Sequence, residues 1–161
     1  MRELSAVFLV LLLTACADSV PPCHFAGQPL EAVSAGCLVV NDDTLLLVQM
    51  PGAKFSPPGG SVDAGESAQC AAERETFEES GVAVQAQDLA YTFDNGFHLF
   101  WCSPVDGIET HIARPLEITS ASWYTSAQFS QLRWRFPDQE VLVAALLSER
   151  LEDKGDEPRS D

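Results

Sequence analysis

The stretch 59–82, GGSVDAGESAQCAAERETFEESGV, constrains the fold more than any other part of the chain. Its glycines permit a tight, irregular backbone that larger residues would block. Ser67 is a predicted N-cap, and Glu66 would lie near the positive end of the helix dipole. Three alanines then favour helix, and Gly81 is the expected stop. The stretch therefore predicts a loop followed by a helix between Ser67 and Gly81.

The acids of this helix are closely spaced. Glu75, Glu78 and Glu79 stand at i, i+3 and i+4, so their carboxylates share one helical face and repel one another. A divalent cation would turn that repulsion into coordination, because hard oxygen ligands suit Mg²⁺ or Mn²⁺. Arg74 could hold one carboxylate through a bidentate ion pair. The alternative is a solvated acidic face without a ligand.

The same residues resemble a Nudix box. That pattern is Gly, five residues, Glu, seven residues, then Arg-Glu-apolar-any-Glu-Glu-any-Gly-apolar. The matching positions are Gly60, Glu66, Arg74, Glu75, Glu78, Glu79, Gly81 and Val82. Thr76 departs from the pattern, which has an aliphatic residue there; threonine has the shape of valine, so the change affects packing and leaves the metal site untouched. The preceding Phe55 to Gly60 resembles the lead into such a box.

The resemblance implies a fold and an activity. The fold would be a Nudix-type α/β/α sandwich with a mixed β-sheet, whereas the pattern alone supports only α/β or α+β. The activity would be metal-dependent hydrolysis of a diphosphate linkage in a nucleoside-diphosphate derivative or a related compound. The alternative is a non-catalytic, Nudix-like ligand-binding lipoprotein. The box does not identify the substrate's variable group.

The family's functional residues carry over onto matching positions. The resemblance implies catalytic roles for Glu75, Glu78 and Arg74. It implies Mg²⁺ or Mn²⁺ ligands in the side chains of Glu75, Glu78 and Glu79 and the carbonyl of Gly59. A further acid from the second half of such domains often assists, and the sequence leaves three candidates unranked: Glu109, Glu117 and Glu140.

Composition fits one globular domain with a small-molecule substrate. The chain has 161 residues, 46% of them hydrophobic, and a formal net charge of -15. This charge argues against binding nucleic acid through its phosphates, although bound metal ions reverse the local sign for a small diphosphate. The predicted divisions are a signal peptide (1–15), a tether (16–31), the Nudix hydrolase domain (32–152) and a flexible tail (153–161).

The N-terminus predicts export. Residues 1–15 contain an apolar run that is too short to span a bilayer and fits a secretory signal. The run ends in Leu-Thr-Ala-Cys, which resembles a bacterial lipobox and implies lipidation of Cys16. Because Ala17 follows, we expect a lipoprotein at the periplasmic face of the outer membrane. The alternatives are simple secretion and a buried N-terminal helix. A further alternative is that the first Met is misassigned and the protein is cytoplasmic.

Cysteine usage agrees with export. With Cys16 lipidated, an even number of cysteines remains, which allows up to two disulfides in three connectivities. The sequence does not choose between these connectivities, and some of the cysteines could instead be buried core residues. The sequence contains no CxxC pair, so it gives no indication of a zinc site. The four residues are Cys23, Cys37, Cys70 and Cys102.

Further elements follow from apolar runs and turn signals. The sequence predicts a buried hairpin over 33–50, a loop over 51–58, strands over 82–93, 97–103 and 119–124, and a helix over 137–151. The helix should bury a stripe made of Val141, Ala144, Ala145, Leu147 and Leu151. Four aromatic residues could either stack on a nucleobase or pack in the core: Phe93, Phe97, Phe100 and Trp101. Trp134 and Arg135 could either line the substrate pocket or pack the helix onto the sheet.

Overall fold

A computed structural model describes residues 19–155 of the chain. The predicted signal peptide, the predicted lipidation site Cys16 and residues 156–161 lie outside this range. Within it, no helix has the length and apolar character needed to cross a membrane.

The described residues form a mixed sheet of seven strands. Its order is β3-β2-β1-β6-β5, with β4 also pairing to β1 and β7 to β2. The β1–β6 pair is parallel and the other pairs are antiparallel. The strands are β1 (Ser34–Asn41), β2 (Thr44–Met50), β3 (Lys54–Ser56), β4 (Gly59–Ser61), β5 (Val84–Thr92), β6 (Phe97–Pro104) and β7 (Ser120–Thr125).

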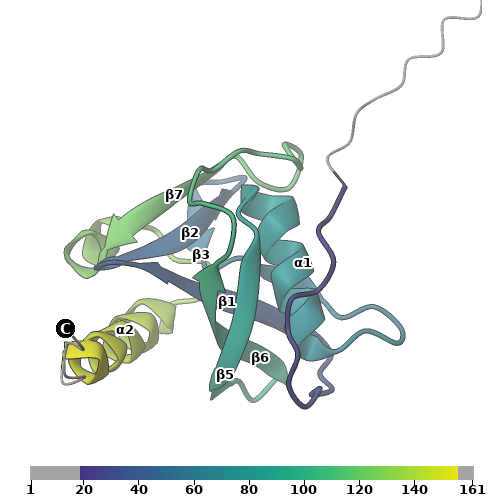
Figure 1. The fold of residues 1–161 in the computed structure, drawn as a ribbon. Helices are drawn as coiled ribbons and strands as arrows, with labels where there is room; N and C mark the ends of the chain where they lie inside the picture. The colour runs from purple at the N-terminus through teal and green to yellow at the C-terminus, as the bar shows by residue number, and fades with distance from the viewer. Residues whose placement is uncertain (1–18, 156–161) are drawn as a thin grey trace, which may run out of the picture.

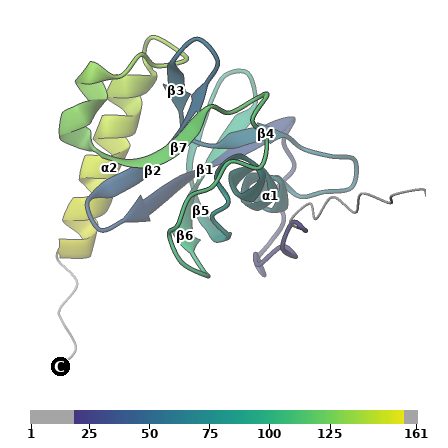
Figure 2. The ribbon, with the colours of Figure 1, turned by 90° about the horizontal axis from the view of Figure 1, so that it is seen from above.

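Helices α1 (Ala68–Ser80) and α2 (Gln139–Gly155) lie on opposite sides of this sheet (Figures 1 and 2). The alternation of β1 explains how both are accommodated, because successive side chains point to opposite faces. Cys37 and Val39 belong to the buried cluster that includes α1, whereas Leu38 belongs to the cluster that includes α2. The continuous apolar run of this strand is thus buried on both sides, and the predicted α/β/α sandwich with a mixed sheet is confirmed.

Four element predictions needed correction. The loop predicted over 51–58 contains the short edge strand β3, which pairs with β2, and the loop predicted from Gly59 begins with strand β4, which pairs with β1. The helix predicted from residue 137 begins at Gln139, and a 3₁₀ helix, η1 (Ser126–Gln131), precedes it. Val141 is 74% exposed and Ala145 is exposed as well, whereas the buried stripe runs through Val143 and Leu147. Which face of α2 is buried depends on its docking onto the sheet, and an apolar list alone did not determine it.

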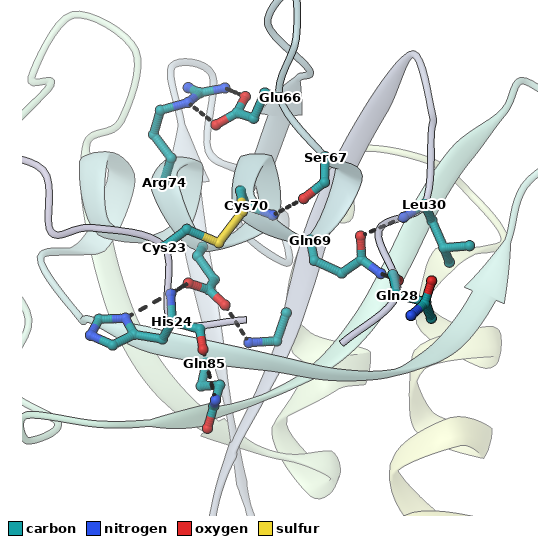
Figure 3. Close-up of a disulfide and its surroundings, with 12 residues drawn as sticks. Cys23, His24, Gln28, Leu30, Glu66, Ser67, Gln69, Cys70, Arg74 and Gln85 are labelled. Carbon is teal, nitrogen blue, oxygen red and sulfur yellow. Dashed lines mark hydrogen bonds and ion pairs between the residues drawn. A yellow bond between two sulfur atoms is a disulfide. The ribbon is translucent and has the colours of Figure 1, made fainter. Parts of the chain in front are cut away.

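The N-terminal segment, defined here as residues 19–31, lies along α1 (Figure 1). A disulfide joins Cys23 to Cys70 of α1. Figure 3 shows Gln69 of α1 bonded twice to the segment: its Oε1 accepts from the Leu30 N–H at 2.9 Å, and its Nε2 donates to the Gln28 carbonyl at 3.1 Å. The segment that was predicted as a tether is therefore fastened to the helix that carries the acids.

A second disulfide joins Cys37 of β1 to Cys102 of β6 across the parallel strand pair. Of the three connectivities open to the four cysteines, the structure has 23–70 with 37–102. The choice follows from the fold, because it places residues distant in sequence side by side.

Candidate active site

Helix α1 has the ends that its sequence predicts. The Ser67 hydroxyl accepts from the Cys70 N–H at 3.2 Å, and Gly81 adopts a left-handed conformation with φ of 75°. A Cβ at Gly81 would also lie 2.1 Å from the ring of His111. Thr76, the departure from the box pattern, is fully buried and donates its hydroxyl to the Ala72 carbonyl at 2.7 Å. The substitution thus affects only the packing face of the helix.

Arg74 and Glu66 join the loop to the helix. The Arg74 guanidinium donates to both carboxylate oxygens of Glu66, at 3.0 and 2.9 Å (Figure 3). It also donates to the Ser61 carbonyl at 2.9 Å, while Glu66 accepts from the Asp63 N–H at 3.1 Å. Burial opposes ionisation of Glu66, but these hydrogen bonds outweigh it and lower the pKa of its carboxyl. The box loop is therefore fixed before any ligand binds.

The same guanidinium reaches the helical acids. Its Nη1 donates to Glu75 at 2.8 Å and to Glu78 at 3.3 Å. Glu79 instead accepts the Gly59 N–H at 2.9 Å. Glu75 and Glu78 therefore meet at Arg74, while Glu79 lies at Gly59.

Two of these carboxyls are buried enough to resist ionisation. Burial raises the pKa of Glu75, although hydrogen bonds from Arg74 oppose the shift. Burial raises the pKa of Glu79 to about 7, against the opposing effect of the Gly59 N–H. The negative charges of Glu75 and Glu117 act in the same direction on Glu79 as its burial does. Both carboxyls therefore favour the protonated form more than a solvated glutamate does.

Gly60 is required by the close approach of the helix. A Cβ at this position would lie 2.4 Å from the carboxylate carbon of Glu75 and 2.5 Å from one of its oxygens. A Cβ here would force the Glu75 carboxylate away from the strand backbone that it now contacts. The box glycine thus leaves room for the Glu75 carboxylate.

The loop between β6 and β7 adds residues that the sequence did not single out. Arg114 forms an ion pair with Glu78 and another with Glu117, the latter at 3.5 Å. Of the three acids left unranked, Glu117 is therefore one that lies near the box acids. Arg114 had no sequence signal, because it stands in an irregular segment whose path only the fold determines.

A cavity of about 610 Å³ borders Gly59 and Gly60 on the α2 side. Phe93, Phe97 and Arg135 line it, whereas Phe100 is fully buried in the core. Trp134 packs in the α2 core and donates its indole N–H to the Phe129 carbonyl at 3.0 Å. Of the two residues that could line a pocket or pack, Arg135 lines the cavity and Trp134 packs in the core beside α2.

Comparison with known proteins establishes the family. The model of the NUDIX domain matches residues 30–146, well over half of the chain. The chain belongs to the Nudix hydrolase family. A MutT-like protein of Streptomyces ambofaciens is 28% identical over 117 residues, which cover 68% of this chain and 74% of that protein.

Solved Nudix-like structures have the same fold. A UDP-X diphosphatase superimposes with a TM-score of 0.62 at 18% identity, covering 78% of this chain and 66% of its own, just under two thirds. An ADP-ribose pyrophosphatase from Streptococcus suis superimposes with a TM-score of 0.60 at 20% identity, covering 71% and 90%. At these identities the likeness concerns the Nudix fold alone.

The Nudix carboxylates are not arranged as a coordination sphere in this structure. Within residues 19–153, no three acidic, histidine or cysteine side chains are gathered so as to hold a metal ion. Glu75 and Glu78 are instead neutralised by Arg74, and Glu78 also by Arg114. These ion pairs engage Oε1 of Glu75 and Oε2 of Glu78.

Proposed function

We propose that this Nudix protein hydrolyses a diphosphate linkage in a nucleoside-diphosphate derivative or a related compound, with Mg²⁺ or Mn²⁺. The observation that carries the proposal is that Arg74 holds Glu75 and Glu78, while Glu79 accepts the N–H of Gly59, which lines a cavity of substrate size. Family membership supports the reaction class. The names of two structural neighbours, a UDP-X diphosphatase and an ADP-ribose pyrophosphatase, are in keeping with a diphosphate substrate.

The donor set suits a hard divalent cation. The side chains of Glu75, Glu78 and Glu79 and the carbonyl of Gly59 would offer only oxygen ligands, which Mg²⁺ and Mn²⁺ prefer. Burial raises the pKa values of Glu75 and Glu79, and a cation would favour their ionised forms. When bound, the ion supplies charge neutralisation for the diphosphate and lowers the pKa of a water molecule.

The residues of the chain itself divide the remaining work. Arg74 is a positioning residue, because it fixes Glu75 and Glu78 while it is held by Glu66. Glu75 and Glu78 are the proposed catalytic acids at the reacting diphosphate. Arg135 lines the cavity, and its positive charge acts to lower the pKa of Glu79. The same charge would attract a phosphate that enters the cavity.

The test is phosphate or nucleotide release by the purified protein with Mg²⁺ or Mn²⁺. The substrate panel is ADP-ribose, dinucleoside polyphosphates, nucleotide sugars, nucleoside triphosphates and an isoprenoid pyrophosphate. Glu78→Gln should lower the rate by orders of magnitude and leave the fold intact, while Glu149→Gln, on the exposed side of α2, should not. Near-normal turnover in Glu78→Gln refutes the assignment. Metal-independent ligand binding without turnover would instead favour the non-catalytic alternative.

We also propose export and lipid anchoring at Cys16. The two disulfides support this proposal, because disulfides persist in oxidising compartments. The substrate would then be extracellular or lipid-linked, since cytosolic nucleotides are scarce outside the inner membrane. Palmitate labelling and membrane fractionation test the anchor. The Cys16→Ser variant should lose both the label and its association with the membrane fraction. Unchanged labelling in that variant would refute it.

A further inference from the structure

Positive charge is scarce on this chain, and part of it is left without a carboxylate partner. The formal net charge is -15. Among the side chains described in residues 19–153, Arg74 and Arg114 form ion pairs with glutamates. Arg150 donates to the Gln87 amide at 3.1 Å and lies over the Trp101 ring. The remaining basic residues of that range, called here the basic edge, have no carboxylate within ion-pair distance: Lys54, Arg133 and Arg135.

Backbone pairing places the members of the basic edge together. The Phe55 N–H donates to the Arg133 carbonyl and the Arg135 N–H donates to the Phe55 carbonyl, both at 2.8 Å. Phe55 of β3 is thus paired in parallel with Trp134, and both rings pack in the core on the α2 side. Because side chains alternate along a strand, the residues that flank these two rings are directed away from that core. Alternate residues of a strand lie about 7 Å apart and neighbouring strands roughly 5 Å apart, so the three exposed cations share one small face.

The basic edge continues the wall of the cavity to the outside. Ser56 and Arg135 line the cavity that borders Gly59. Lys54 and Arg133 precede them by two residues on the same paired segments, and neither is among the described residues that line the cavity. Burial raises the pKa of Glu79 to about 7, and the positive charge of Arg135 opposes this shift. One end of the basic edge is therefore within electrostatic reach of the box acids, and the other end lies beyond the cavity.

Charge gives the physical reason to expect an anionic ligand here. Like charges at these separations repel, although the chain has 24 acidic residues against 9 basic ones with which to neutralise them. The Arg133 Nη1 donates to the Gly52 carbonyl at 3.4 Å, and the Arg135 guanidinium lies 5.3 Å from the centroid of the Phe136 ring. Both partners are neutral. A phosphate group placed over the basic edge would supply the negative charge that these contacts do not.

We propose that the basic edge binds a further phosphate group of the substrate, beyond the diphosphate at the box acids. A chain of three or more phosphates, or a second phosphorylated position, would leave the cavity past Arg135 and reach Lys54 and Arg133. Guanidinium and ammonium groups both bind phosphate oxygens. The inference rests on the proposed function, because it names a substrate class for the same site. It favours substrates with three or more phosphate groups over ADP-ribose and nucleotide sugars, which carry two.

Binding of two small probes separates this inference from hydrolysis. Calorimetry with Mg²⁺ present would compare methylenediphosphonate with bis(phosphonomethyl)phosphinate, which has one more phosphorus group. Neither probe contains a P–O–P bond, so binding does not depend on turnover. We expect the longer probe to bind about tenfold or more tightly. This advantage should shrink as the salt concentration is raised, because exposed charges are screened.

Single substitutions test the residues. Lys54→Gln and Arg133→Gln should each reduce the advantage of the longer probe by about threefold, while the affinity for the shorter probe is unchanged. Arg133→Lys keeps the charge and should retain most of the advantage. The matched control is Arg150→Gln, which removes one positive charge from α2 and should leave both affinities as in the parent. Thermal melting checks that each variant is folded.

Several results would overturn the inference. These are equal affinities for the two probes, no binding of either probe, or an advantage that survives in both glutamine variants. An equal loss in Arg150→Gln would also overturn it, because the effect would then be one of net charge alone. Equal probe affinities, together with sedimentation on phosphatidylglycerol but not phosphatidylcholine vesicles that is lost in Lys54→Gln, would assign the basic edge to a lipid surface instead.

Hydrolysis is scored separately from probe binding. Turnover of ADP-ribose in a protein that binds both probes equally would refute the additional phosphate site and leave the proposed function standing. A preference for the longer probe that depends on Lys54 and Arg133, without turnover of any compound in the panel, would do the reverse.

Discussion

Removal of the disulfide between Cys23 and Cys70 should destabilise the domain and loosen the attachment of the N-terminal segment to α1. The perturbation is the double variant Cys23→Ala, Cys70→Ala. The bond closes a loop whose ends are 47 residues apart. In the chain-entropy description, a loop of this length contributes about 4 kcal/mol to the free energy of unfolding. This value is an upper figure, since denatured chains retain some structure.

Other contacts limit how far the segment separates. Glu73 of α1 is buried and accepts two backbone N–H groups, from His24 at 2.5 Å and from Ala86 of β5 at 2.9 Å. Gln69 adds its two bonds to the segment, each contributing about 1 kcal/mol. The segment should therefore stay partly docked in the variant, and the loss should be about 2–4 kcal/mol.

Urea unfolding measures this loss, and hydrogen exchange locates it. Exchange should accelerate in residues 19–31 and in the first turns of α1, while β1 and β6 remain protected. The matched control is Cys37→Ala, Cys102→Ala, which removes the core disulfide and should leave the N-terminal segment protected. A loss below about 1 kcal/mol, or unchanged exchange in residues 19–31, would refute the argument that this bond fastens the segment to the helix.

Three further predictions concern the acids. Without metal, the folded protein holds the Glu79 proton up to pH about 7, against 4.5 in the unfolded chain, so stability should fall by about 3 kcal/mol as pH rises through this window. Melting curves in EDTA check this, and the slope should flatten in Glu79→Gln; an equal slope there would contradict it. Glu73→Gln leaves one of two backbone N–H groups without its acceptor, so urea unfolding should show a loss of about 1–3 kcal/mol, and an unchanged midpoint would count against the contact. Gly60→Ala places a methyl group against the Glu75 carboxylate, so kcat should fall at least about tenfold while far-ultraviolet circular dichroism is unchanged; parental kcat would show that the approach is not needed.

Much of the fold was predictable because its signals are local. Apolar runs and turn residues gave the β1–β2 hairpin, and the cap residues Ser67 and Gly81 gave the limits of α1. The short strand β3 was missed because three residues carry little periodicity and depend on pairing with β2. The buried face of α2 was misjudged at Val141 because docking decides which apolar side chains are covered.

The amino-acid sequence alone predicted which acids share one face of α1. Helical spacing alone places Glu75, Glu78 and Glu79 on one face, and the box pattern assigns Arg74 and Glu66 to it. These relations span a few turns of one helix and its leading loop, so they need no long-range contact. The sequence by itself therefore predicted the family and the acids of the site.

Only the tertiary structure decided what surrounds those acids. Arg114 reaches Glu78 from a distant loop, and Gln139 reaches the cavity from the far end of the chain. The same holds for the pairing of the cysteines and for the attachment of the N-terminal segment to α1. Each depends on contacts between residues tens of positions apart, which follow from how the sheet and helices pack and leave no periodic trace in the sequence.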